Sequence, residues 1–204
     1  TINIAMAAGI KIFHYQWEGD FAAAKNYAIE QASGDWIIFL DADETFSQES
    51  LKYIRGLIAR EHHHINDTDG IICSIINIDE DKDNLEISRF INLRIFRNVP
   101  YLRYKGKVHE CIQHQNAKLK IVSEKDLLKI YHTGYSSKRI KNKLLRNLEI
   151  LGKDIAKKGE GIAHYRYLAN CYQGLGDYKK AIKYAKLHIC SEATSIGSES
   201  EVYR

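Results

Sequence analysis

The chain has 204 residues, of which 45% are hydrophobic and 27% are charged, and this composition excludes disordered and collagen-like proteins. The 30 Lys and Arg exceed the 26 Asp and Glu by only four. Because both signs are mixed along the chain, its charge does not favour a nucleic-acid partner. The longest apolar runs, such as residues 36–40, are far shorter than the ~18 residues of a membrane span.

The first part of the chain alternates between helical and strand patterns. Helical spacing of small and apolar residues predicts helices over residues 2–8 and 21–32, with a short strand over residues 11–15 between them. The apolar run at residues 36–40 lies between two aspartates. Such a run is typical of a strand that is buried on both faces.

The next elements continue the alternation. Ser47 is a predicted N-cap of a helix that carries apolar residues as far as Ile58, and strand patterns follow at residues 71–78 and 90–96. An order of alternating strands and helices favours an α/β domain over residues 1–135. We expect a mostly parallel, Rossmann-like sheet in it.

From residue 136 to residue 204 the pattern is helical throughout. An apolar stripe predicts one long helix over residues 140–155, and Gly159 then interrupts it. Residues 165–181 resemble one tetratricopeptide unit, which is a pair of antiparallel helices around a tight turn. Because one unit cannot bury its own faces, we expect it to pack on the preceding helix or to continue past Arg204.

Acidic residues follow the apolar strand directly. Asp41, Asp43 and Glu44 come at its C-terminal end, which is the end of an open α/β sheet where ligands bind. Hard divalent cations prefer oxygen ligands, commonly one or two carboxylates together with substrate phosphates. The spacing therefore predicts a cation site at this edge of the sheet.

Several sequence blocks together resemble the family 2 glycosyltransferases. These blocks are residues 11–17, 20–28, 32–44, 94–97, 106–110 and 132–135. The likeness covers about residues 1–135, and the blocks follow the order found in a bacterial subgroup that includes lipopolysaccharide-core glucosyltransferases. It implies a GT-A fold and a hexosyltransferase-like enzyme, which passes a sugar from a nucleotide donor to an acceptor with inversion at the anomeric carbon.

The resemblance also implies residue roles on the donor side. Asp43 of the Asp-x-Asp motif would bind Mn²⁺ or Mg²⁺, and His132 would be a further contact to the metal or the diphosphate. Asp41 would face the nucleoside. Lys25 and Asn26 would bind the nucleotide-sugar, with Lys25 standing where many relatives carry Arg.

On the acceptor side, the resemblance implies a base and its neighbour. Glu110 would take the proton from the acceptor, since inversion by a single displacement needs a carboxylate opposite the leaving group. His109 would orient Glu110 or bind substrate. The acceptor itself is left open among a saccharide, a lipid-linked saccharide and a peptide, and we expect the donor to be a UDP-sugar.

Three further expectations concern the extent of the chain, the partners of its helical segment and its location. Relatives have a first strand and a base-binding region before the position of Thr1, so we expect a fragment that lacks them. The helical segment, residues 136–204, would hold a peptide partner or a second copy of the chain. Four cysteines without a C-x-x-C pair favour a reducing cytoplasm, with the inner face of the membrane as the alternative location.

Two other functions also fit parts of the sequence. Residues 41–45 match the D-x-D-x-T pattern of haloacid-dehalogenase-type phosphatases, in which the first Asp is a nucleophile, although that pattern should end the first strand of a domain. A non-catalytic interaction module would account for the tetratricopeptide-like segment. It would leave the acidic motif unexplained.

Overall fold

The computed structural model describes residues 2–63, 68–107 and 110–191. The chain divides into two compact units. The first contains residues 1–76 and 88–132, and the second contains residues 77–87 and 133–204. No helix among the described residues has the length and apolar character that crossing a membrane requires.

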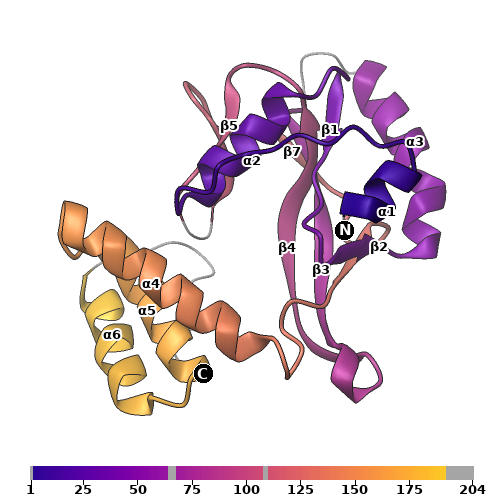
Figure 1. Cartoon of the computed structure of the whole chain (residues 1–204). Coiled ribbons are helices and arrows are strands. Elements are labelled where there is room, and N and C mark those ends of the chain that lie inside the picture. The colour runs from indigo at the N-terminus through magenta and orange to yellow at the C-terminus, as the bar shows by residue number, and fades with distance from the viewer. Residues whose placement is uncertain (1, 64–67, 108–109, 192–204) are drawn as a thin grey trace. The chain divides into compact units, whose positions relative to one another are not determined.

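The elements follow one another along the chain in the order drawn in Figure 1. They are α1 (Ile2–Ala7), α2 (Phe21–Glu30), β1 (Trp36–Ile38), β2 (Glu44–Phe46), α3 (Gln48–His63), β3 (Gly70–Asp79), the 3₁₀ turn η1 (Glu80–Lys82), β4 (Leu85–Arg97), β5 (Leu102–Lys105), β6 (Cys111–His114), β7 (Ile121–Ser123), β8 (Lys129–His132), α4 (Ile140–Lys158), α5 (Ile162–Gly174) and α6 (Tyr178–Cys190).

The predicted starts of the helices have clear local causes. Ser47 accepts a hydrogen bond from the amide of Ser50 at 3.1 Å, which confirms it as the N-cap of α3. Asp20 caps α2 in the same way by accepting from the amide of Ala23 at 2.9 Å. The cap residue thus fixes where each of these helices begins.

The main sheet is mixed, so the expectation of a mostly parallel sheet was wrong. Among the described residues its strand order is β1-β4-β3-β8-β2, with β7 paired to β3. The pairs β1–β4 and β2–β8 are antiparallel, and β3–β7 is parallel. Neighbouring β3 and β4 are joined only through η1, whereas a parallel crossover needs a dozen or more residues.

The strand expected at residues 11–15 is also absent, because this segment has no regular structure.

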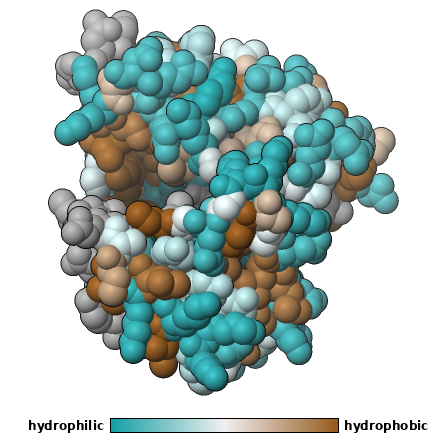
Figure 2. Space-filling view, turned by 90° about the vertical axis from the view of Figure 1, so that its left-hand side faces the viewer, coloured by the Kyte–Doolittle hydropathy of each residue, from teal (hydrophilic) through white to brown (hydrophobic). Residues whose placement is uncertain are grey.

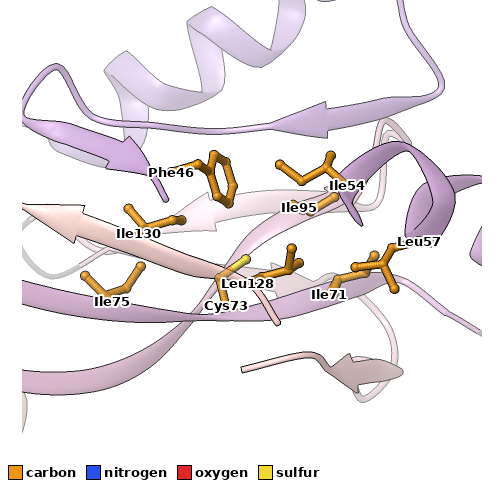
Figure 3. Close-up of a cluster of buried hydrophobic side chains, with 9 residues drawn as sticks. All are labelled: Phe46, Ile54, Leu57, Ile71, Cys73, Ile75, Ile95, Leu128 and Ile130. Carbon is orange, nitrogen blue, oxygen red and sulfur yellow. The ribbon is translucent and has the colours of Figure 1, made fainter. Parts of the chain in front are cut away.

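Helices cover both faces of the sheet in the first unit. Ile95 and Phe96 are adjacent on β4 and point to opposite faces, and they belong to different buried clusters. Phe96 packs with Ile29 of α2, and Ile95 packs with Ile54 of α3. Figure 3 shows the cluster of Ile95 and Ile54, which also contains Phe46, Leu57, Ile71, Cys73, Ile75, Leu128 and Ile130. This three-layer packing confirms an α/β class for the unit.

The second unit is helical apart from the strand ends that it includes. Helix α5 packs on both α4 and α6, and Gly174 of α5 approaches so closely that an added Cβ would lie 2.5 Å from Leu144 of α4. The likeness of the α5–α6 pair to a tetratricopeptide unit stays a prediction. Asp79 and Asp81 near the end of β3 bind the start of α4, where the Ser137 hydroxyl donates to Asp79 at 2.5 Å and the Lys138 amide donates to Asp81 at 3.1 Å.

Candidate active site

The segment that follows β1 forms a tight acidic turn. The Glu44 amide donates to the Asp41 carbonyl at 3.0 Å, and the Asp41 amide donates to the Glu44 carboxylate at 3.1 Å. Arg94 of β4 closes this turn, because its Nη2 atom bonds both the Glu44 carboxylate and, at 3.1 Å, the Asp41 carboxylate. The turn is therefore held by a buried cation as well as by its own backbone.

Lys25 of α2 is a second cation at this turn. Its ammonium is buried and lies 3.0 Å from the Asp41 carboxylate and 2.7 Å from the Glu110 carboxylate. It also lies over the rings of Phe39 and Tyr104, at 4.9 and 5.2 Å from their centroids. Such ring faces attract a cation. Residues that are far apart in the sequence, Lys25, Asp41 and Glu110, are thus brought into one charged cluster.

The charges around Asp41 decide its protonation. Burial alone would raise the pKa of Asp41, but the positive charges of Lys25 and Arg94 outweigh burial and hold this pKa below its ordinary value. Burial would likewise lower the pKa of Arg94, and the charges of Glu44 and Asp41 raise it instead. Asp41 therefore remains ionised at neutral pH, with its charge balanced by two neighbours.

Asn26 lies next to Lys25 on α2 and has a different environment. Its side-chain amide donates to the Tyr104 carbonyl at 3.0 Å and accepts from the Tyr104 amide at 2.8 Å. This pair of bonds fixes α2 to β5. The predicted contact of Asn26 with a nucleotide-sugar stays a prediction, and the structure gives Asn26 a positioning contact in addition.

Asp43 and His132 form the second pair at the turn. His132 Nε2 lies 3.3 Å from the Asp43 carboxylate, and the antiparallel register of β2 and β8 places Glu44 opposite His132. No group of three or more His, Cys, Asp or Glu side chains suited to a metal occurs within the described ranges. One carboxylate and one imidazole are compatible with a cation that takes its remaining ligands from phosphates and water, as Mg²⁺ commonly does. Asp41 is less suited, since two cations already engage its carboxylate.

His109 lies outside the described residues, so its predicted role stays a prediction. The sequence reasoning did not assign Arg94 or Glu44 to the site, although the block at residues 94–97 and the acidic motif contained them. A usable signal was the charge of Arg94 next to Ile95 and Phe96, because a cation at the buried end of a strand needs anionic partners.

The comparisons with known proteins agree with this architecture. The family model described as Glycosyl transferase family 2 matches residues 2–125. The chain is 30% identical over 185 residues to the SPbeta prophage-derived glycosyltransferase SunS of Bacillus subtilis, with 88% of this chain and 41% of that protein covered, and it matches the SunS glycosyltransferase of Bacillus phage SPbeta equally. It is also 33% identical over 112 residues to a TPR repeat-containing protein of Synechococcus elongatus, with 55% of this chain and 26% of that protein covered. The chain thus spans less than half the length of these relatives.

Proposed function

We propose, from the fact that this chain belongs to glycosyl transferase family 2, that it transfers a sugar from a nucleotide-diphosphate sugar to an acceptor in a metal-dependent, inverting reaction. The observation that carries the proposal is the charged cluster at the end of β1. There Lys25 contacts both Asp41 and Glu110, and Asp43 pairs with His132. The SunS proteins, which are similar over most of this chain, are named glycosyltransferases.

The proposed reaction assigns one step to Glu110. The Glu110 carboxylate takes the proton of the acceptor nucleophile while the bond from that nucleophile to the anomeric carbon forms and the bond to the diphosphate oxygen breaks. The nucleoside diphosphate leaves with the bonding electrons. A single displacement of this kind inverts the anomeric centre, and positioned acid–base groups typically contribute about 10²–10⁴-fold to such proton transfers.

The donor half of the proposal concerns the leaving group. Asp43 and His132 would hold Mn²⁺ or Mg²⁺, which would neutralise negative charge on the leaving diphosphate. Lys25 would add a fixed positive charge beside the same diphosphate, since preorganised charges act most strongly where the reaction develops charge. Asp41 and Asn26 would complete the nucleotide-sugar contacts. We propose a UDP-sugar as the donor.

The acceptor half rests on the second unit. We propose that helices α4–α6 bring an acceptor or a second copy of the chain to the enzyme. The support is the hairpin-like packing of α5 on α6, together with the tetratricopeptide repeats in the name of one relative. Stacked helix pairs of that kind build binding surfaces for peptides.

The experiment is a thermal unfolding titration of the chain with Mn²⁺ and UDP, each alone and both together. We expect a rise in Tm only with both, because ligand at a hundredfold excess over its Kd stabilises by about 2.7 kcal/mol, or ~5–10 °C for a chain of this size. Asp43→Ala should remove the shift. Asp126→Ala, in an exposed turn away from the acidic motif, is the matched control and should keep it.

The same samples also test the reaction. A panel of nucleotide-sugars incubated with Mn²⁺ should show release of nucleoside diphosphate from one donor only, and Asp43→Ala should abolish this release. Absence of any Mn²⁺-dependent shift, or a shift that survives Asp43→Ala, would contradict the proposed metal site.

A further inference from the structure

We propose that Arg94 is a positioning residue, which holds the turn of residues 41–44 so that Asp43 faces outward toward the metal while Asp41 is kept out of metal coordination. This inference rests on the function proposed above. It assigns a role to a buried residue whose guanidinium contacts the Asp41 and Glu44 carboxylates.

The backbone brings Arg94 to the turn. Strand β4 lies beside β1, and the register places Ile38 opposite Ile95. The pairing continues one step further, because the Phe39 amide donates to the Arg94 carbonyl at 2.9 Å. Arg94 is consequently the residue of β4 that lies beside the point where β1 ends and the acidic turn begins.

The side chain of Arg94 then completes a closed ring of contacts. The Asp41 amide donates to the Glu44 carboxylate, Glu44 binds the Arg94 guanidinium, and the guanidinium returns to the Asp41 carboxylate at 3.1 Å. The side chain of Glu44 is only 2% exposed, and Arg94 is 5% exposed. Buried charges persist in a protein when they are paired and hydrogen-bonded, so this ring has little freedom to rearrange.

The ring distributes roles among the acidic residues. The Glu44 carboxylate contacts Arg94 and accepts from the Asp41 amide, and the Asp41 carboxylate contacts both Arg94 and Lys25. Asp43 contacts His132 and is partly exposed. An Asp-x-Asp motif could present either carboxylate to a cation, and the cations around Asp41 select Asp43.

The test compares two conservative substitutions on the same strand. Arg94→Lys keeps the charge but shortens the side chain and removes the Nη2 atom, which contacts both Asp41 and Glu44. Arg97→Lys is the matched control, because the Arg97 guanidinium bonds the carbonyls of Thr68 and Glu61 at 2.7 and 2.8 Å instead of the acidic turn. Glu44→Gln, which keeps the shape and removes the charge of the partner carboxylate, is a second variant.

The first measurement is the Kd of Mn²⁺ in the presence of UDP, read from the electron paramagnetic resonance signal of free Mn²⁺. We expect Arg94→Lys to raise this Kd by about tenfold or more, because a turn that is less firmly held presents Asp43 to the metal less often. Glu44→Gln should raise it in the same direction, and Arg97→Lys should leave it within about twofold. An unchanged Kd in Arg94→Lys, or an equal rise in Arg97→Lys, would overturn the inference.

The second measurement is amide hydrogen exchange at residues 41–44, which needs no ligand. The Asp41 and Glu44 amides should exchange faster in Arg94→Lys than in the wild type, with no change in Arg97→Lys. If the wild type bound no Mn²⁺, this result would contradict the proposed metal site, and hydrogen exchange alone would test the positioning role of Arg94. Unchanged protection of these amides would overturn the positioning role, whereas faster exchange would support it.

Discussion

Lys25 stands between the carboxylate expected to serve the donor and the carboxylate expected to serve the acceptor. Its ammonium lies 3.0 Å from Asp41 and 2.7 Å from Glu110. Two neighbouring carboxylates without a cation between them would repel each other. The lysine therefore balances the negative charges of both groups in a partly buried place.

This arrangement predicts a pH effect. The pKa of Asp41 is below its ordinary value of 3.8, so its ionised form contributes stability above that pH and the contribution is lost as the pH falls below it. Lys25→Met removes the charge that lowers the pKa of Asp41 most, and burial still raises this pKa. We expect the midpoint of acid unfolding, followed by circular dichroism, to move to higher pH.

Lys52→Met is the control for this experiment, because Lys52 is exposed on α3. This substitution also removes one positive charge, but it leaves the cluster intact. The two variants should differ in their acid midpoints. Equal midpoints would mean that Lys25 does not set the ionisation of Asp41.

Glu110 carries the next prediction. We expect Glu110→Gln to lower kcat by about 10²–10⁴-fold, since the amide cannot accept the proton, with little change in the KM for the nucleotide-sugar. Glu124→Gln is the matched control, because Glu124 is ion-paired with Arg60 at 2.5 Å and its side chain is 15% exposed, close to the 13% of Glu110. Turnover retained in Glu110→Gln would remove it from the role of base.

Much of the cluster was predictable from local sequence, but its internal pairing was not. Asp41 and Asp43 follow an apolar run directly, and that pattern marks a strand end. The ion pairs of Asp41 with Lys25 and Arg94 join residues 16 and 53 positions apart. Only the packing of α2 and β4 around β1 determines which cation reaches which carboxylate, and a single sequence does not contain that information in any local pattern.

At the scale of elements, the close approach of β3 to β4 depends on Gly70. A Cβ added there would lie 2.7 Å from the Ile95 carbonyl oxygen and 3.1 Å from the Cβ of Phe96. Both of these neighbours are fixed, one by the backbone and the other by its buried position. The start of β3 therefore has no room for a side chain.

Gly70→Ala should consequently destabilise the first unit by about 1–3 kcal/mol, the usual cost of inserting an atom into a packed core. Gly56→Ala is the control, because nothing lies within 4 Å of a Cβ added in the middle of α3. It should stabilise by about 0.5–1 kcal/mol, since Ala loses less backbone entropy than Gly. Denaturant unfolding measures both changes, and equal stabilities of the two variants would refute the steric account.

The elements also show where sequence patterns succeed. Helices α2, α3 and α4 follow from apolar spacing and their caps or glycines. Strands β1 and β3 follow from apolar runs, and β4 contains the strand pattern predicted at residues 90–96. Strands β5, β6 and β7 are only three or four residues long and give almost no periodic signal. Residues 11–15 have the composition of a strand, but none of the described strands pairs with them, and a strand forms only where it finds a partner.

At the scale of the whole molecule, exposed apolar side chains mark a surface on α6. Tyr178, Ile182 and Ile189 are exposed and lie at helical spacing, among several lysines of the same helix. Figure 2 shows that brown hydrophobic areas interrupt the teal surface on the face that it draws. Apolar areas of this kind commonly mark interaction sites.

We expect this surface of α6 to associate with a second copy of the chain. Ile182→Glu should lower the measured molar mass from dimer toward monomer in light scattering after size-exclusion chromatography, because a buried charge opposes association. Leu51→Glu, at an equally exposed position on α3, is the control and should leave the mass unchanged. A monomeric wild type would contradict association of two copies and would leave a peptide as the expected partner.

The attachment of Asp79 and Asp81 to the beginning of α4 has a practical consequence for anyone who wishes to excise the helices. The chain passes between the two units at residues 76, 87 and 132, so no single cut separates them. Expression of residues 136–204 alone would discard the aspartates that accept from Ser137 and Lys138, so the segment that leads into α4 would lose these two hydrogen bonds. A fragment that keeps these contacts would join residues 77–87 to residues 133–204 through a linker.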